Sequence, residues 1–339
     1  MNPWPSISVI MPTYNRCDVT ERSLRLFLAQ DYPADRFELL VADNSSDDTP
    51  AMVLRLAEEA AWDGKAAVRL LASDERLPAV KRNRALEAAT GELVVFMNDD
   101  VWVGPSFLAE HVASHRAHDE PIAVLGFIEQ SREMPSEPFC DWFQPFSYYE
   151  LAGLEDQAVP WRYFWSMNIS LPRSEMLGRN LVFHEDWREI GEEDVELGYR
   201  WVQAGRRIIY NPRARGEHFH PHTLASAARV QESIGRGLRD VEMLIPERGL
   251  HERFGLFTWS NTPSAIVRGL ARRMLFNAFT VPRIERWLAA HPQPSRSAQW
   301  VYWKVLLFYT NRGYRNTPRR DVQALRTGPP LTLEGSLQS

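Results

Sequence analysis

A run of five apolar residues that ends in three polar ones constrains the fold of this chain more than any other stretch. Leu93 to Met97 is apolar without alternation, and Asn98-Asp99-Asp100 follows directly. An unbroken apolar run predicts a strand buried on both faces, as in a parallel sheet covered by helices. Carboxylates at the end of such a strand need a partner, and hard divalent cations take oxygen ligands. The stretch therefore predicts a metal site or, alternatively, a polar turn that leaves a strand.

Strand and helix patterns alternate along the first hundred residues. Strand patterns at 6–11, 37–42 and 67–72 are each followed by a helical pattern. This alternation predicts an α/β fold with a mostly parallel sheet flanked by helices. Ligands bind at the carboxyl ends of the strands in such sheets. The first strand is not followed by Gly-x-Gly-x-x-Gly and the chain has no Walker A loop, which excludes the usual dinucleotide and P-loop sites.

Composition limits the class of protein and its partners. The 339 residues carry a net charge of -5, which argues against a nucleic-acid partner because such proteins usually have a basic excess. Cys17 and Cys140 are too few for a disulfide framework or a four-thiolate zinc site, so we expect a reducing, cytoplasmic compartment. Residues 1–8 lack the basic and apolar regions of a signal sequence.

Two polar clusters follow in the second half of the chain. Glu193 and Asp194 open a helical pattern, where the helix dipole favours acidic side chains by about 0.3–1 kcal/mol, so a structural role is one interpretation. His218 and His220 alternate, so on a strand both would face one side, with a spacing that suits a metal. A zinc hydrolase built on these two and His222 is disfavoured, because no HExxH or similar motif occurs.

Five motifs occur together in a fixed order. They are PTYNR at 12–16, VADNSS at 41–46, KRN at 81–83, GELVVFMNDD at 91–100 and GEEDVELGYR at 191–200. The combination resembles the family 2 glycosyltransferases, which have a GT-A fold, and within them members similar to bacterial rhamnosyltransferases. The resemblance implies a GT-A glycosyltransferase domain at 1–222. It leaves a helical C-terminal region at 223–330 and a tail at 331–339 that we expect to be disordered.

The resemblance implies a nucleotide site at the first two motifs. Pro12, Thr13, Tyr14 and Asn15 match the residues that hold the nucleobase and ribose, with Tyr14 stacking on the base. Asp43 matches the acid that hydrogen-bonds the base.

The later motifs imply the rest of the donor and metal site. Arg82 matches the basic residue near the nucleotide, and Asp99 and Glu193 are expected to contact the nucleotide sugar. Asn98-Asp99-Asp100 aligns with the family's Asp-x-Asp motif, with Asn in the first position. Asp100 is then the implied metal ligand and Asn98 a weaker ligand or a ribose contact. His218 matches the histidine that can complete the metal site.

The implied reaction is the transfer of a sugar from a nucleotide-diphosphate sugar, UDP- or dTDP-linked, to a hydroxyl of a glycan or lipid-linked acceptor. Mn²⁺ or Mg²⁺ would neutralise the leaving diphosphate. Asp194 matches the catalytic base, and displacement would invert the anomeric centre. Residues 131–160 are expected to form a loop or lid over the donor. The expected role is polysaccharide or glycoconjugate synthesis.

Two other functions stay open. A nucleotidyltransferase also uses a sheet edge, a metal and a nucleotide, but it would usually show an early Gly-rich loop, which residues 12–16 lack. A non-catalytic nucleotide-sugar-binding protein of the same fold is the other alternative, because Asn98 departs from the family motif.

The C-terminal region interleaves Arg with aromatic residues between 263 and 310. The arginines are Arg268, Arg272, Arg273, Arg283 and Arg286. These helices are expected to pack on the catalytic domain or to form a homodimer. Alternatively, they make peripheral contact with the inner face of a membrane, because basic amphipathic helices bind anionic lipid.

Overall fold

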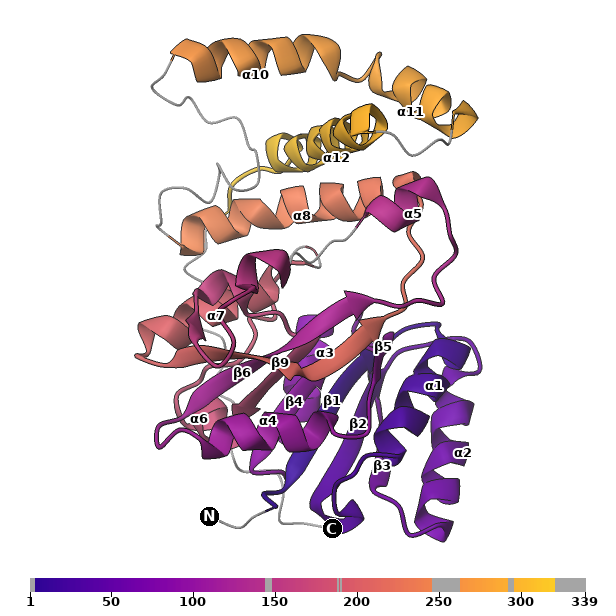
Figure 1. Cartoon of the computed structure of the whole chain (residues 1–339), viewed down its shortest axis with the longest axis vertical. Coiled ribbons are helices and arrows are strands. Elements are labelled where there is room, and N and C mark those ends of the chain that lie inside the picture. The colour runs from indigo at the N-terminus through magenta and orange to yellow at the C-terminus, as the bar shows by residue number, and fades with distance from the viewer. Residues whose placement is uncertain are drawn as a thin grey trace.

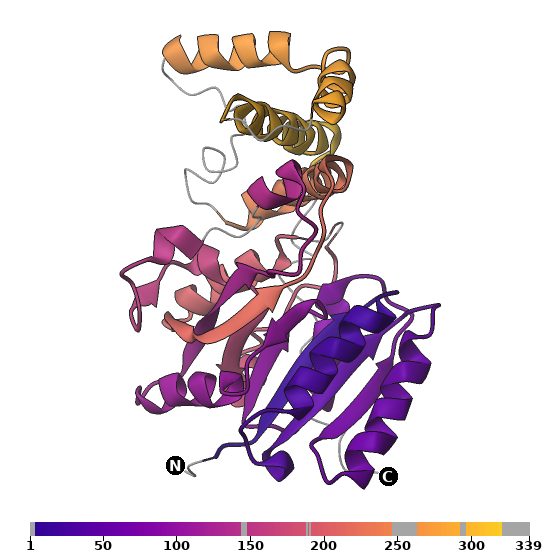
Figure 2. The same ribbon diagram turned by 45° about the vertical axis from the view of Figure 1, so that its right-hand side comes forward.

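The computed structural model describes residues 4–143, 148–187, 189, 191–245, 263–291 and 296–320. A nine-stranded sheet with packed helices forms the lower part of the molecule, and the C-terminal helices are stacked above it (Figure 1). The two parts are also separated in the view turned by 45° (Figure 2). The predicted α/β architecture with a helical C-terminal region is therefore observed.

The N-terminal half of the sheet is parallel, as the alternating patterns predict. Its strands run in the order β3-β2-β1-β4, namely Ala67–Ala72, Phe37–Asp43, Ile7–Thr13 and Leu93–Met97. The connecting helices are α1 (Cys17–Leu28), α2 (Thr49–Trp62) and α3 (Pro78–Ala88), with a short 3₁₀ turn η1 (Ala34–Arg36) before β2. Every residue of β2 and β4 is buried, and β4 is the unbroken apolar run that predicts such burial.

The other half of the sheet is mixed. Its strands follow β4 in the order β8-β6-β9-β5, namely Asn168–Pro172, Ile122–Gln130, Arg207–His218 and Val101–Val103, and β7 (Ala158–Val159) pairs with β9. β8 is antiparallel to β4 and to β6, whereas β6 and β9 are parallel. The helices of this half are α4 (Phe107–Arg116), α6 (Arg173–Gly178) and α7 (Glu193–Gln203). Only three residues separate β4 from β5, which is too few for the crossover that joins parallel strands. β5 instead pairs antiparallel with β9.

The segment 131–160, predicted as a long loop or lid, contains short elements of its own. They are α5 (Pro138–Trp142), the 3₁₀ turn η2 (Tyr148–Leu151) and β7, and a further 3₁₀ turn, η3 (Trp161–Tyr163), follows. Phe139 and Trp142 of α5 pack on Tyr302, with ring centroids 5.1 and 5.5 Å apart. This part of the segment is therefore tied to the C-terminal helices.

The C-terminal helices form layers above the sheet domain. They are α8 (Leu224–Leu244), α10 (Pro263–Leu275), α11 (Val281–Ala290) and α12 (Arg296–Asn316). Thr223 and Ser226 form a capping box that starts α8. Figure 1 shows α8 next to the sheet domain, α12 above it and α10 outermost. The domain boundary at 222 stays a prediction, and the tail at 331–339 lies outside the described residues.

The two long helices α8 and α12 meet without space for side chains at their crossing. A Cβ added to Gly235 would collide with the carbonyl oxygen of Thr310, and one added to Gly313 with that of Glu232. Arg312 of α12 also donates to Glu232, at 2.6 and 2.5 Å. Among the helices described, none combines the length and the hydropathy needed to cross a bilayer.

Candidate active site

The carboxyl ends of β1, β2 and β4 lie at one edge of the sheet, because the three strands are parallel neighbours. Side chains tie these ends together. Thr13 at the end of β1 donates a hydrogen bond of 2.8 Å to Asp99, which follows β4. The backbone N–H of Asn15 donates to Ser45, which follows β2, at 2.7 Å. The structure therefore brings the first, second and fourth sequence motifs together.

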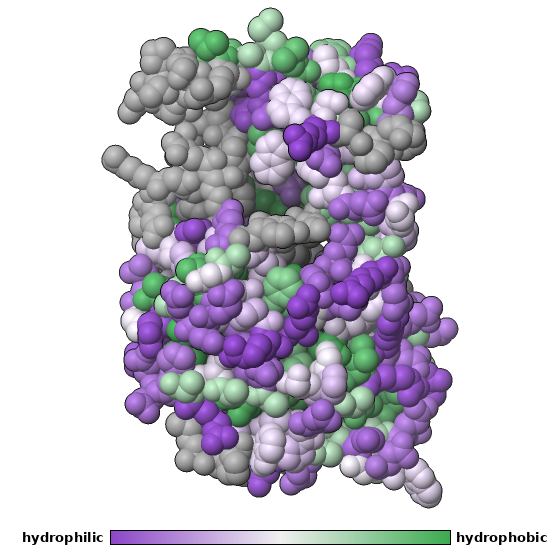
Figure 3. Space-filling view, in the orientation of Figure 1, coloured by the Kyte–Doolittle hydropathy of each residue, from purple (hydrophilic) through white to green (hydrophobic). Residues whose placement is uncertain are grey.

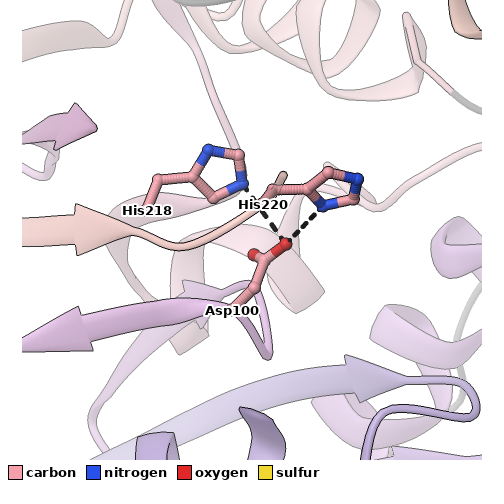
Figure 4. A group of neighbouring side chains, drawn as sticks. All are labelled: Asp100, His218 and His220. Atoms are coloured by element: carbon pink, nitrogen blue, oxygen red, sulfur yellow. Dashed lines mark hydrogen bonds and ion pairs between the residues drawn. The ribbon is translucent and has the colours of Figure 1, made fainter. Parts of the chain in front are cut away.

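Asp100 is the centre of a buried cluster that includes two histidines. Its Oδ2 lies 3.3 Å from Nε2 of His218 and 2.8 Å from Nδ1 of His220 (Figure 4). The sheet sets this geometry, because Val101 pairs directly with His218 between β5 and β9. The other carboxylate oxygen of Asp100 is buried and has no hydrogen-bond partner among the described residues. One oxygen and two nitrogen ligand atoms within 4.8 Å of one another suit a divalent cation.

The sequence-based prediction of the metal site was incomplete. It paired Asp100 with His218, and the structure adds His220. The alternation of the two histidines was the available signal. The prediction also missed Arg16, whose Nη1 lies 3.0 Å from Asp99 and 2.7 Å from Asp100 and whose Nη2 lies 2.7 Å from His220. Its place directly after Asn15 was the available signal.

The charges in this cluster shift the pKa values of both carboxyls. Burial opposes the ionisation of Asp100, but His218, His220 and Arg16 outweigh it and hold its pKa well below the usual range. Burial and the charge of Asp100 raise the pKa of Asp99. Burial would lower the pKa of Arg16, yet the two carboxylates outweigh it and raise the pKa. Arg16 is therefore a fixed cation in the cluster.

The predicted nucleotide residues lie beside this cluster. Tyr14 is 54% exposed, which leaves its ring free for stacking, and the Lys81 ammonium lies 5.9 Å from the ring centroid. Asp43 is buried and accepts hydrogen bonds from the backbone and hydroxyl of Ser45, at 3.1 and 2.5 Å. Lys81 donates to the carbonyl of Thr13 at 2.6 Å. Buried polar groups thus lie next to an exposed aromatic ring.

Asn15 and Pro12 shape the loop that carries Tyr14. Pro12 is half-buried within β1. Asn15 has a φ of 50°, a left-handed conformation that Asn tolerates better than most residues. Its side-chain oxygen accepts a hydrogen bond of 2.8 Å from the backbone of Ser46.

Asp194 lies in the first turn of α7 and is held by the segment that precedes β8. Its Oδ2 accepts hydrogen bonds from the backbone N–H and the hydroxyl of Ser166, at 3.0 and 3.2 Å. Burial and the neighbouring Glu193 raise the pKa of Asp194 to about 7. A fixed carboxyl that titrates near neutral pH can accept a proton from a bound hydroxyl.

Arg82 connects the Asp194 region with the Asn-Asp-Asp segment. Its guanidinium donates to Glu193 at 3.0 Å and to Asn98 at 3.3 Å. Arg82 and Glu193 are each 5% exposed, so this is a buried ion pair. In this structure Asn98 therefore faces Arg82. The link fixes the start of α7 relative to the carboxyl end of β4.

A cavity of about 470 Å³ adjoins the cluster and was not predicted from the sequence. His218, His220 and His222 line one side of it, and Tyr148 and Tyr210 line another. The Tyr148 hydroxyl is buried and has no hydrogen-bond partner among the described residues. Burial, Tyr210 and Asp194 raise the pKa of Tyr148 well above its usual value. The cavity lining thus includes both the histidines and Tyr148, and the charge of Asp194 contributes to the raised pKa of Tyr148.

Residues 8–167 match the family described as Glycosyl transferase family 2. This segment belongs to the family. The chain is 27% identical over 271 residues to Validoxylamine A glucosyltransferase of Streptomyces hygroscopicus subsp. jinggangensis, an alignment that covers 72% of this chain and 63% of the relative. Glycosyltransferase AglD of Haloferax volcanii is 28% identical over 233 residues, which are 60% of this chain and 36% of that protein. This glycosyltransferase therefore spans less than two thirds of the length of these curated relatives.

Solved structures share the fold of this glycosyltransferase. Mannosyltransferase PcManGT from Pyrobaculum calidifontis, in complex with GDP-Man and Mn²⁺, superposes with a TM-score of 0.63 at 22% identity, over 92% of this chain and 87% of that one. TarS of Staphylococcus aureus in complex with UDP-GlcNAc has a TM-score of 0.53 at 18% identity, over 91% of each chain. The predicted GT-A fold is thereby confirmed. The finer likeness to rhamnosyltransferases stays a prediction.

Proposed function

We propose that this glycosyltransferase transfers a sugar from a nucleotide-diphosphate sugar to an acceptor hydroxyl, with a divalent cation at Asp100, His218 and His220. The observation that carries the proposal concerns Asp194, a carboxyl with a raised pKa. Its neighbour Glu193 is linked through Arg82 to Asn98, at the same sheet edge that carries this cluster. Further support comes from GDP-Man and Mn²⁺ in PcManGT and UDP-GlcNAc in TarS.

The residues of the cluster fit a divalent cation. A carboxylate and two imidazoles supply its ligand atoms, and the buried oxygen of Asp100 that lacks a partner among the described residues is available as well. When bound, Mn²⁺ or Mg²⁺ would neutralise charge on the leaving diphosphate. Mixed nitrogen and oxygen ligands favour Mn²⁺ over Mg²⁺, which prefers oxygen alone. Arg16 adds a fixed positive charge next to Asp99 and Asp100.

Asp194 acts as the general base in the proposed mechanism. The two hydrogen bonds from Ser166 orient its carboxylate. The carboxylate accepts the proton of the acceptor hydroxyl while the hydroxyl oxygen attacks the anomeric carbon. The nucleoside diphosphate leaves from the opposite face of the sugar, so the anomeric configuration inverts. The raised pKa brings the base close to the pH at which proton transfer is most efficient.

The acceptor occupies the cavity beside the histidines in this proposal. Aromatic side chains and carboxylates line it, among them Tyr148, Tyr210, Phe127, Glu129 and Glu155. Aromatic rings offer flat apolar surfaces to sugar rings, and carboxylates accept hydrogen bonds from sugar hydroxyls. We therefore propose a glycan or lipid-linked glycan as the acceptor, in polysaccharide or glycoconjugate synthesis. A relative from Campylobacter jejuni, 35% identical over 97 residues, is named for a lipid-linked undecaprenol acceptor.

Tyr14→Ala should weaken nucleotide binding without loss of the fold. A base stacked on an aromatic ring contributes about 1–3 kcal/mol, so we expect about 5- to 100-fold weaker binding in calorimetry. Asp43→Ala should relax the choice between UDP-, dTDP- and GDP-sugars. Trp62→Ala is the matched control, because Trp62 is also exposed but lies at the far end of α2. Unchanged affinity in Tyr14→Ala would contradict the assignment.

Tyr148→Phe should raise the KM for the acceptor and leave donor affinity unchanged. The phenol lacks a partner among the described residues, so an acceptor hydroxyl is its proposed partner. Loss of one such hydrogen bond is expected to raise KM about two- to tenfold. Tyr32→Phe is the control, because its hydroxyl donates to Pro5 far from the cavity. An unchanged acceptor KM would show that the hydroxyl does not contact the acceptor.

The whole proposal is tested by a donor screen with purified protein. Thermal shift with UDP-, dTDP- and GDP-sugars, with and without Mn²⁺, identifies the donor because a bound ligand stabilises the fold. Release of nucleoside diphosphate with that donor then reports transfer or hydrolysis. Binding without release would favour a non-catalytic binding protein. Formation of a nucleotide sugar from a nucleoside triphosphate and a sugar 1-phosphate would favour a nucleotidyltransferase.

A further inference from the structure

The outermost helix, α10, exposes a stripe of apolar side chains. Val267, Leu270 and Met274 are 64, 52 and 77% exposed. Their spacing of three and four residues places them on one face of the helix. Leu275 and Phe279 extend the exposed apolar surface at its end. Hydrophobic side chains gather along the top of the molecule over α10 (Figure 3). A continuous exposed apolar surface marks a site of interaction.

The region that carries this stripe is strongly basic, although the whole chain has a net charge of -5. Residues 263–320 contain eleven Lys and Arg residues and a single acidic residue, Glu285. That carboxylate accepts a hydrogen bond of 2.8 Å from the hydroxyl of Tyr309. The positive charge of the outer helices is thus not balanced within their own sequence.

Acids of α8 match part of this positive charge. Among the described residues, Arg312 pairs with Glu232, Arg319 with Glu242 and Arg320 with Asp240. These pairs involve the C-terminal part of α12 and the residues after it, and they tie α12 to α8.

Arg272 of α10 lies near cations of both α10 and α12. Burial and Arg273 lower the pKa of Arg272, and burial and Arg272 lower the pKa of Lys304. Burial, Arg273 and Arg272 also lower the pKa of Arg315. These effects indicate that like charges from both helices lie within interacting distance of Arg272.

We propose that α10 docks on the surface of a bilayer that contains anionic phospholipid. Val267, Leu270 and Met274 enter the boundary between head groups and acyl chains, and the exposed Arg283 and Arg286 of α11 meet the phosphates. Trp300, which contacts Phe276 at the end of α10 and is 53% exposed, suits the interface, where Trp is enriched.

Two other occupants fit the surface less well. A second copy of the chain would cover the apolar stripe but would bring the same excess of positive charge to the contact. A soluble polyanion would match the charge but offers no hydrocarbon to the exposed stripe. An anionic bilayer satisfies both the apolar and the basic side chains.

The proposal is tested by co-sedimentation of the full chain with vesicles. One set contains phosphatidylcholine alone, and the other contains phosphatidylglycerol and phosphatidylcholine in equal parts. We expect binding to the mixed vesicles, weaker binding in high salt and none to neutral vesicles. Leu270→Glu with Met274→Glu should lower the bound fraction at least about tenfold. Leu54→Glu is the matched control, because Leu54 is 54% exposed on α2.

Each other outcome overturns the proposal. Equal binding to both vesicle types, or no binding, would exclude an anionic lipid surface. A dimer in light scattering that the double variant converts to a monomer would assign the stripe to a second copy. Binding to heparin that is as tight as vesicle binding and insensitive to the double variant would assign the surface to a polyanion. Vesicle binding needs no donor or acceptor, so its failure leaves the proposed reaction untouched.

Discussion

Asp194→Asn should lower the rate of sugar transfer by about 10²–10⁴-fold, the contribution typical of a general base. The amide keeps the size of the side chain and can still accept the hydrogen bonds from Ser166, but it cannot take the proton of the acceptor. Donor affinity should stay unchanged in calorimetry, because the base does not contact the nucleotide in the proposed mechanism. The decisive measurement is kcat with saturating donor and acceptor.

The pH dependence of the native enzyme follows from the same group. Transfer needs the ionised carboxylate, so kcat should rise with pH through about 7 and level off above it. The stability of the fold changes with pH in the opposite direction to kcat. The pKa of Asp194 in the folded chain exceeds its ordinary value of about 3.9, so the folded state binds the extra proton between these values. Through this group, stability falls as pH rises from about 4 to 7.

The unfolding temperature of the Asp194→Asn variant shows whether a loss of activity comes from misfolding. The variant should unfold at the same or a higher temperature than the native protein at pH 8, because it removes a buried charge whose burial cost exceeds the stabilisation from Arg82. Loss of donor binding in this variant would instead make Asp194 part of the donor site. A kcat within twofold of the native value would remove Asp194 from the mechanism.

Asp100→Ala should abolish metal binding and lower transfer by about 10³-fold, since a metal contributes several kcal/mol to charge stabilisation in such reactions. Asp100 supplies the oxygen at the centre of the cluster, and the two imidazoles that remain are a weaker site. Titration with Mn²⁺ by calorimetry measures the first effect, and nucleotide release measures the second. The fold should persist, because Arg16 retains its 3.0 Å contact with Asp99.

The control for this variant is Asp63→Ala, which removes an exposed carboxylate at the C-terminal end of α2. It should bind Mn²⁺ and catalyse transfer like the native protein. Full activity of Asp100→Ala in the presence of a chelator would refute both the metal and its proposed ligand. Added Mn²⁺ should also raise the melting temperature of the native protein and leave that of Asp100→Ala unchanged.

The sequence predicts the parallel half of the sheet because its strand patterns alternate with helical patterns and because β1, β2 and β4 are almost wholly buried. β4, with five apolar residues in a row, is the clearest case. The mixed half could not be predicted in this way. β8 pairs with β4 although about seventy residues separate them in the chain, and no local pattern encodes such a partner.

The same contrast applies to the candidate site. Asp100 and His218 were inferred from the resemblance to the family, in which residues at these positions bind the metal. His220 lies beyond the end of β9, where the loop decides the direction of a side chain. Arg16 is 83 residues from Asp99, so only the fold reveals that they pair. The cavity is likewise made by segments distant in the chain, around Phe127, Tyr148 and Tyr210.

The tight crossing of α8 and α12 affects the distance between α10 and the catalytic edge of the sheet. Because Gly235 and Gly313 let the two backbones touch and Arg312 locks onto Glu232, the two helices form a stiff spacer between α10 and the sheet domain. Packed helices are about 8–10 Å apart, so two such layers hold the catalytic edge at a set height above any surface on which α10 rests. An enzyme with such a spacer would select acceptors by the distance of their hydroxyl from that surface. Larger residues at either glycine would then change which acceptor is used before they change the chemistry.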